Sequence, residues 1–197
     1  MATNSGSGSK TLDLGTLGSN PFTTTNASPT VTVADTAHGL AVGDIATYVG
    51  ATTTGGLDMN GSWLVASVVD ANSYTFTHDS NASSGATGGS AAVAYSYAFK
   101  VHSTDTAGEY EFVIDGSNLV AGDRTAMMIA SKVRSSDGLT EYQRGEINDS
   151  QLGSRKLKKQ IRSLVICIAT NESASFFLEQ TAGTARAVPW AVKKLGA

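Results

Sequence analysis

The sequence predicts an all-β protein: a small N-terminal β-barrel followed by a C-terminal antiparallel β-sandwich, jelly-roll-like. Glycine (21 residues), serine, threonine, valine and alanine dominate, which disfavours long helices. Apolar residues recur at every second position in many short segments, and Asn, Asp and Gly separate these segments. Only residues 149–160 favour a helix, and Gly153 weakens it.

Residues 1–20 are expected to form a flexible arm, because "MATNSGSGSKTLDLGTLGSN" is rich in Gly and Ser and shows no sustained period. This segment has no apolar core of a secretory signal, and no stretch of the chain approaches the roughly 18 apolar residues of a membrane span. The sequence therefore predicts a soluble protein without a membrane partner. The candidate residues that order the arm against a neighbouring subunit are apolar: Leu12, Leu14, Leu17 and, just beyond the arm, Phe22.

Residues 21–90 are expected to form the small β-barrel module. Val31 and Val33 alternate with threonine, and "DIATYV", "SWLVASVV" and "YTFTH" follow as further short strands. Turn residues separate these runs at close spacing, a pattern typical of a small antiparallel barrel or sandwich.

Residues 91–197 are expected to form the β-sandwich, after the linker-like run "HDSNASSGATGGSAA". A long strand opens it, with bulky apolar residues at alternate positions from Val93 to Val101. "QIRSLVICIAT" is apolar at nearly every position, which predicts a strand covered on both faces and a buried Cys167. "ASFFLEQ" is expected to pair with that strand.

One short pattern occurs twice, as "HGLAVGD" at residues 38–44 and "SNLVAGD" at residues 117–123. Glycine tolerates a positive φ, and aspartate accepts hydrogen bonds from nearby backbone amides, so Leu-x-x-Gly-Asp predicts a turn that starts a strand. Because the second copy has no histidine, we expect His38 to have a structural role in its loop.

No group of residues with metal-binding or catalytic spacing emerges. The three histidines, His38, His78 and His102, are far apart in sequence, and there is no cysteine pair or HExxH-like run. No nucleophile or orienting acid is identifiable beside His38. The sequence therefore predicts no metal, no cofactor and no enzymatic activity.

The charge distribution gives no general attraction to nucleic acid, because the net charge is −3. Residues 1–99 contain six aspartates and one lysine, and nearly all basic residues follow, which would suit packing between copies. One basic cluster consists of Arg155, Lys156, Lys158 and Lys159, with Arg162 close by. It is either a solvated segment or a contact for phosphates, acidic lipids or an acidic patch on a protein partner. It lacks the interleaved aromatic residues of nucleic-acid sites.

Aromatic residues on strands are candidates for a sugar-stacking platform. The candidates are Tyr48, Trp63, Tyr95, Tyr97 and Trp190. Most of them lie at alternating strand positions, which favours a place in the core over a sugar-binding role.

Residues 30–77 resemble a small β-barrel module of tailed-bacteriophage virion proteins, often likened to the FCCH domain of ubiquitin-activating enzymes. The matching positions are Ala37-His38-Gly39-Leu40, Gly43-Asp44, Asn60-Gly61 and the run "VVDANSYTFT". In that module they are turn and core positions. "YEFVIDGSNLVAGD", "KVRSS" and "LEQTAGTARAVPW" are in turn similar to an uncharacterised β-sandwich of phage structural proteins.

These resemblances imply a virion protein assembled in the host cytoplasm. The function expected first is capsid decoration, in which the protein stabilises the head by contacts with the major capsid protein or other virion subunits. The resemblance also implies a homo-oligomer, with a trimer favoured. The alternative is a tail or head-fibre component that binds a host-surface glycan.

Overall fold

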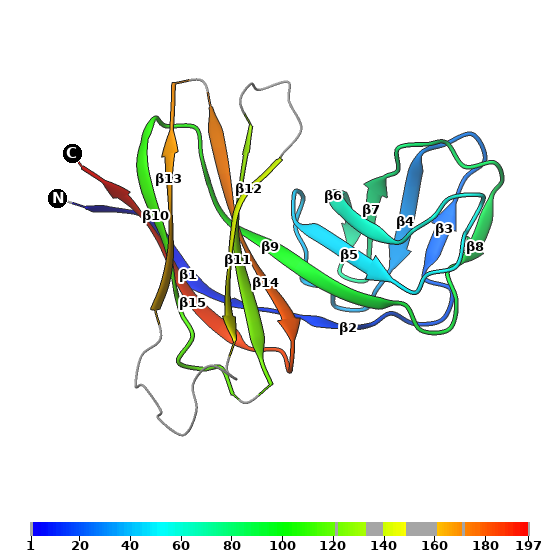
Figure 1. Ribbon diagram of the computed structural model, residues 1–197. Coiled ribbons are helices and arrows are strands. Elements are labelled where there is room, and N and C mark those ends of the chain that lie inside the picture. The colour runs from blue at the N-terminus through cyan, green and yellow to red at the C-terminus, as the bar shows by residue number, and fades with distance from the viewer. Residues whose placement is uncertain (1, 121, 133–139, 149–160, 171, 197) are drawn as a thin grey trace. The chain divides into compact units, whose positions relative to one another are not determined.

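The computed structural model describes residues 2–120, 122–132, 140–148, 161–170 and 172–196, and in these residues it contains strands and no helix (Figure 1). The chain divides into two compact units. Unit 1 combines Met1–Asp13 with Phe99–Ala197, and unit 2 is Leu14–Ala98. Unit 2 is therefore inserted into unit 1, a division that differs from the expected boundaries after residues 20 and 90.

The described residues of unit 1 form eight strands in two arrays, ordered β1-β15-β10-β13 and β12-β11-β14-β9. The first strand of the unit pairs with the last, the second with the seventh, the third with the sixth and the fourth with the fifth. This nested order is that of a jelly roll, so the predicted fold class is confirmed. The strands are β1 (Thr3–Thr11), β9 (Ala94–Thr104), β10 (Gly108–Asp115), β11 (Arg124–Lys132), β12 (Thr140–Asn148), β13 (Ile161–Ile168), β14 (Ser173–Ala182) and β15 (Ala187–Leu195).

The core of unit 1 lies between the two arrays. Phe112 of β10 and Phe176 of β14 meet edge to face, with their ring centroids 5.4 Å apart. Complete burial of one such aromatic ring stabilises the fold by roughly 1.5–3 kcal/mol. Fully buried side chains from both arrays surround this pair, among them Ile114, Met127, Ile129, Leu178, Val188 and Val192.

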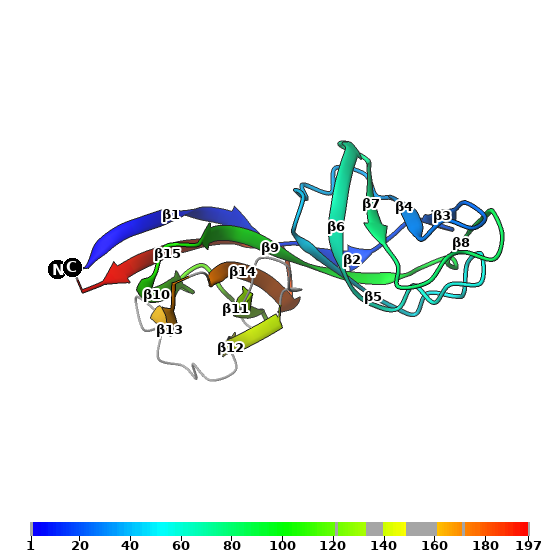
Figure 2. The same cartoon turned by 90° about the horizontal axis from the view of Figure 1, so that it is seen from above.

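The expected flexible arm is instead the edge strand β1 of the sandwich. It pairs antiparallel with β15, from Thr3 opposite Lys194 to Thr11 opposite Ala187. Figures 1 and 2 show these two strands side by side. Leu12, which follows β1, is fully buried, and its N–H donates to the Arg186 carbonyl at 2.8 Å.

The glycines of β1 are required by aromatic side chains that lie against the strand. A Cβ atom at Gly6 would stand 2.7 Å from the His102 Nδ1 atom, and one at Gly8 would stand 3.3 Å from the Trp190 ring. Lys10 places its Nζ atom 3.9 Å from the centroid of the Phe99 ring. Aromatic rings thus fill the space that side chains would occupy on this strand, which is why a segment with a linker's composition forms a strand.

Unit 2 is a curved antiparallel sheet with the strand order β9-β5-β6-β7-β4-β3-β8, and β2 also pairs with β9. The first part of β6 pairs with β5 and the second part with β7, with bulges that bend the strand. The N–H of Thr52 donates to the Gly89 carbonyl at 3.1 Å and links the segment after β5 to the end of β8. The remaining strands are β2 (Leu14–Thr16), β3 (Phe22–Thr24), β4 (Thr30–Ala34), β5 (Ile45–Val49), β6 (Gly61–Asp70), β7 (Ser73–Thr77) and β8 (Ala86–Gly88).

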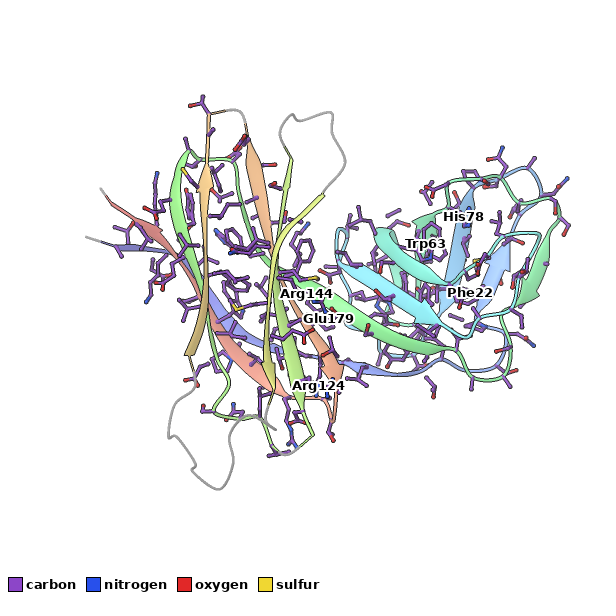
Figure 3. All side chains as sticks on the ribbon, viewed as in Figure 1. Phe22, Trp63, His78, Arg124, Arg144 and Glu179 are labelled. Atoms are coloured by element: carbon purple, nitrogen blue, oxygen red, sulfur yellow. The ribbon has the colours of Figure 1, made fainter. Side chains whose placement is uncertain are left out.

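A chain of tyrosine hydroxyls runs through the core of unit 2. The Tyr48 and Tyr74 hydroxyls are 2.6 Å apart, those of Tyr74 and Tyr97 are 3.1 Å apart, and Tyr97 donates to Asp35. Burial raises the pKa of all three hydroxyls, so they stay protonated and remain donors. Phe22 packs edge to face on Tyr48 with a centroid distance of 5.0 Å (Figure 3).

The repeated Leu-x-x-Gly-Asp pattern forms the same turn in both units, as predicted. The Asp44 carboxylate accepts the Ala41 N–H at 2.8 Å, and the Asp123 carboxylate accepts the Val120 N–H at 3.0 Å. The preceding glycines have φ angles of 88° and 91°, values that favour glycine. Each turn therefore closes through its aspartate, without a contribution from a histidine in the second copy.

Asp123 also ties the end of β14 to the start of β15. Its side chain is 1% exposed, and it accepts the Thr184 N–H at 3.0 Å and the Arg186 Nε–H at 2.9 Å. Desolvation raises the pKa of this carboxyl, but the hydrogen bonds from Thr184, Val120 and Arg186 outweigh it, so the pKa lies below its usual range.

The strand covered on both faces is β14 and not β13, which corrects the expectation for "QIRSLVICIAT". Phe176, Phe177 and Leu178 are consecutive and fully buried. In β13, by contrast, Val165 is 41% exposed and Cys167 is exposed, because β13 lies at the end of its array with one face toward solvent. An apolar run in sequence does not distinguish these two environments.

Replacing Gly6 with valine is expected to destabilise unit 1 by about 1–3 kcal/mol, because the new side chain overlaps His102. Ser7→Val is the control, since Ser7 is exposed on the same strand. Urea unfolding followed by Trp190 fluorescence in a Trp63→Phe background measures the free energy of unfolding. Equal losses in the two variants would show that the glycine is not required.

The Asp123→Asn variant is expected to lower the stability of unit 1 at neutral pH by about 1–3 kcal/mol, because Arg186 loses a charged partner. Since the folded pKa of Asp123 is depressed, its contribution is present above the unfolded pKa of about 4 and is lost as pH falls through the folded value. Denaturant unfolding between pH 7 and pH 2 should show that the free energy of unfolding falls less steeply with decreasing pH in Asp123→Asn than in the wild type. Asp105→Asn, at an exposed position, should behave like the wild type.

Candidate interaction surface

The apolar residues expected to contact a partner contribute mainly to the chain's own structure. Leu12 and Phe22 are fully buried, and Leu17 is 3% exposed. Leu14 is half-buried on β2, opposite Ser96 of β9. The sequence pattern does not distinguish an anchor for a neighbouring subunit from a core residue of the same chain.

The basic cluster falls outside the described residues. Nothing in the structure therefore bears on the predicted partner contacts of Arg155, Lys156, Lys158 and Lys159.

Two histidines hold loops through the same pair of hydrogen bonds. His38 accepts the Leu40 N–H at Nδ1 and donates from Nε2 to the Asp70 carbonyl, each at 3.0 Å. His78 accepts the Ser80 N–H at Nδ1, and its Nε2 lies 3.1 Å from the Asp58 carbonyl. In both loops, the two ring nitrogens thus bond backbone groups on either side of the imidazole.

The third histidine, His102, lies beside β1. Its Nε2 atom is 3.0 Å from the Ser5 hydroxyl, and partial burial lowers its pKa. In the described part of the chain, no three His, Cys, Asp or Glu residues are grouped so that they could hold a metal ion.

Three of the five candidate residues for a sugar platform, Tyr48, Trp63 and Tyr97, pack within unit 2. Tyr48 and Tyr97 are fully buried. Trp63 stacks on Phe76 and His78 with centroid distances of 4.9 and 4.7 Å, and its Nε1–H donates to the Met59 carbonyl (Figure 3). Their faces are therefore used inside the protein.

The surface that remains open in unit 1 is the outer side of the β1-β15-β10-β13 array, called here the outer face. Side chains alternate along a strand, so residues between the buried ones point to this side. They are small or apolar in the middle and charged on β10 and at one end of β15. The members are Ser7, Ser9, Pro189, Ala191, Lys193, Glu109, Glu111, Val113, Val165 and Cys167.

A shallow hollow of about 270 Å³ lies in the outer face. Its apolar lining residues are Val113, Ile114, Pro189, Trp190 and Ala191, and Asp115 and Lys193 also line it. The lining includes no hydroxyl, thiol or imidazole group that would act as a nucleophile or general base. Chemically, the hollow fits an apolar side chain of a partner with polar groups around it.

Unit 2 has exposed apolar side chains as well. They lie at the tip of the Leu-x-x-Gly-Asp turn and along β5 and β6: Val42, Val49, Leu64, Val68 and Val69. Scattered exposed apolar side chains of this kind are ordinary on protein surfaces, so these five mark no interaction site.

Sequence reasoning missed the outer face. The signal was available in "EYEFVID", where Val113 occupies the polar side of an otherwise alternating strand. Only the strand pairing shows that Val113 and Ala191 lie opposite each other.

Comparison with known proteins finds no matching family model and no matching curated protein. Among solved structures, the chain is similar to "Phage phi92 endosialidase", with a TM-score of 0.34 and 23% identity. The similarity covers 48% of this chain and 13% of that chain. The chain therefore spans a small part of that protein's length, and a likeness of this size assigns no function.

The residues that the structure describes include no helix with the length and apolar character needed to cross a membrane.

The His38→Ala variant is expected to destabilise unit 2 by about 1–3 kcal/mol, because the buried Leu40 N–H loses its acceptor. His78→Ala removes an equivalent pair of hydrogen bonds at a more exposed site and should lower the free energy of unfolding by less. Calorimetric unfolding of both variants tests this. A larger loss at His78 would contradict the structural role assigned to His38.

Proposed function

We propose that the protein is a structural component of a tailed-phage virion, and specifically a capsid decoration protein that stabilises the head through contacts with capsid subunits. The observation that carries the proposal is the outer face, an open sheet surface with small and apolar residues at its centre. Such a surface is suited to adhesion.

The resemblance of residues 30–77 to a virion module supports the proposal. The residues that carry it occupy turn and core positions in unit 2. Gly43 has a positive φ, Asp44 closes its turn, and Leu40 is 7% exposed. These are positions that a small barrel needs for folding, so the module serves as a scaffold.

Adhesion of this kind acts through area and copy number. A specific interface buries about 800 Å² per partner, and a four-stranded array offers a surface suited to that. Many copies on one particle multiply modest contacts into a strong total. The mechanism involves no catalytic step, no cofactor, no nucleic acid and no membrane, and the protein's location is the virion.

The homotrimer implied by the sequence resemblance stays a prediction. It would place three copies around a local threefold axis of the head, each with its outer face toward capsid subunits. Cross-linking of the protein bound to purified heads, followed by the mass of the cross-linked species, tests it.

Binding to particles tests the proposed function. The Ala191→Arg variant should lose binding to purified heads at least tenfold, because it places a long cation beside Lys193 in the centre of the outer face. Val42→Arg in unit 2 is the matched control at an exposed position and should bind like the wild type. Co-sedimentation with heads and with tails measures occupancy.

The outcomes separate the candidate locations. Binding to tails instead of heads would overturn capsid decoration and keep a virion role. Absence from both particles, with saturable binding to a host glycan, would overturn the structural role altogether.

A further inference from the structure

The end strands of the two units differ in how they are protected from pairing with another protein. Unpaired strand edges attract further strands, so proteins shorten, charge or cover them. In unit 2, β8 has three residues. In unit 1, β12 carries the charged pair Arg144 and Glu146, and Gly145 of β12 lies against Leu164 of β13.

Strand β1 lacks most of these protections. It is nine residues long, contains no proline and no acidic residue, and has Lys10 as its single charge. Its one irregularity is a bulge between Asn4 and Gly6, which leaves Gly6–Thr11 regular. Within the described residues, β15 is the sole strand that pairs with it.

The hydrogen-bond pattern identifies which residues of β1 face the open side. Directly opposed residues of an antiparallel pair alternate between bonding each other and pointing their N–H and C=O groups away. Because Leu12 donates to Arg186, the pairs of Lys10 and of Gly8 with β15 are also of the bonded kind. The open edge is therefore formed by the backbones of the residues between them, which are Ser7, Ser9 and Thr11, all exposed.

This edge is complementary to a second copy of itself. In an antiparallel pair centred on Ser9, that residue faces its own counterpart, and Ser7 faces Thr11 of the other copy. All three outward-pointing residues then form hydrogen-bonded pairs, with small hydroxyl side chains opposite one another. Gly8 faces Lys10, so no like charges meet. Centring on Lys10 would oppose the two lysines, and centring on Ser7 would bring the bulge into the ladder.

We propose that two copies of the chain associate edge to edge through β1, antiparallel and centred on Ser9, so that the four-stranded arrays of both copies join into one continuous sheet. This contact is β-strand addition, in which backbone hydrogen bonds provide the affinity. It goes beyond the proposed function and does not depend on where in a particle the protein lies. In this contact, β1 stays paired with β15 and uses its other edge to bind the second copy.

Disulfide trapping tests the register. Both cysteine variants are made in a Cys167→Ser background, because Cys167 is exposed. Ser9→Cys should form a disulfide-linked dimer under mild oxidation, since directly opposed Cα atoms lie about 5.5 Å apart. Ser7→Cys is the matched control on the same strand and face. Its two copies would lie about 13 Å apart along the strands and should cross-link at least tenfold more slowly.

Sedimentation measures the association without cross-linking. The wild-type chain should dimerise with rising concentration, and Ser9→Lys should raise the dissociation constant at least tenfold, because it opposes two cations at the centre of the ladder. Val42→Lys should leave the constant unchanged. Trp190 fluorescence shows whether each variant keeps β1 in place, since Trp190 lies against Gly8.

Three results would overturn the proposal. One is a wild-type chain that stays monomeric at all concentrations. Another is a Ser7→Cys variant that cross-links as fast as Ser9→Cys. The third is a Ser9→Lys variant that dimerises like the wild type while Trp190 reports an intact fold. A dimer that forms while binding to phage particles is absent would retain this contact and reject the proposed function.

Discussion

The pairing of β1 with β15 is the interaction on which the architecture of unit 1 depends. It joins the first strand of the sandwich to the last, and the other strand pairs nest inside it. Backbone hydrogen bonds supply the ladder, and rings from other strands supply the packing that Gly6 and Gly8 cannot provide themselves. Because β1 belongs to the sandwich, unit 2 becomes an insertion between the first and second strands of a jelly roll.

Each unit contains one turn closed by an aspartate, Asp44 in unit 2 and Asp123 in unit 1. The two turns differ in the further hydrogen bonds that surround them. In unit 2 the neighbouring His38 adds a second set of backbone contacts, to Leu40 and Asp70. In unit 1 Asp123 binds Thr184 and Arg186 and so fixes the approach to β15. The buried carboxylate thereby supports the same strand that β1 requires as its partner. Local turn chemistry and the nested strand order are coupled through this one residue.

The polar groups that first suggest chemistry are used for structure. His38 and His78 bond backbone groups, the tyrosine hydroxyls form a chain ending on Asp35, and Arg144 pairs with the buried Glu179 at 2.9 Å (Figure 3). In the described part of the chain, the outer face and the edge of β1 are open to other molecules. The outer face is the physical basis of the proposed virion role.

The sequence by itself determined the β class and the turns, because alternation and Gly-Asp chemistry are local properties of a few neighbouring residues. For that reason, Val31 and Val33 indicated a strand, and the two Leu-x-x-Gly-Asp runs indicated turns. Only the tertiary structure decided where β1 lies, which strand is buried on both faces, and that Leu12, Leu17 and Phe22 are core residues. These outcomes depend on contacts between residues far apart in sequence, such as Gly8 with Trp190, and no local pattern encodes such partners. The outer face and the open edge of β1 became visible for the same reason, once the strand order was known.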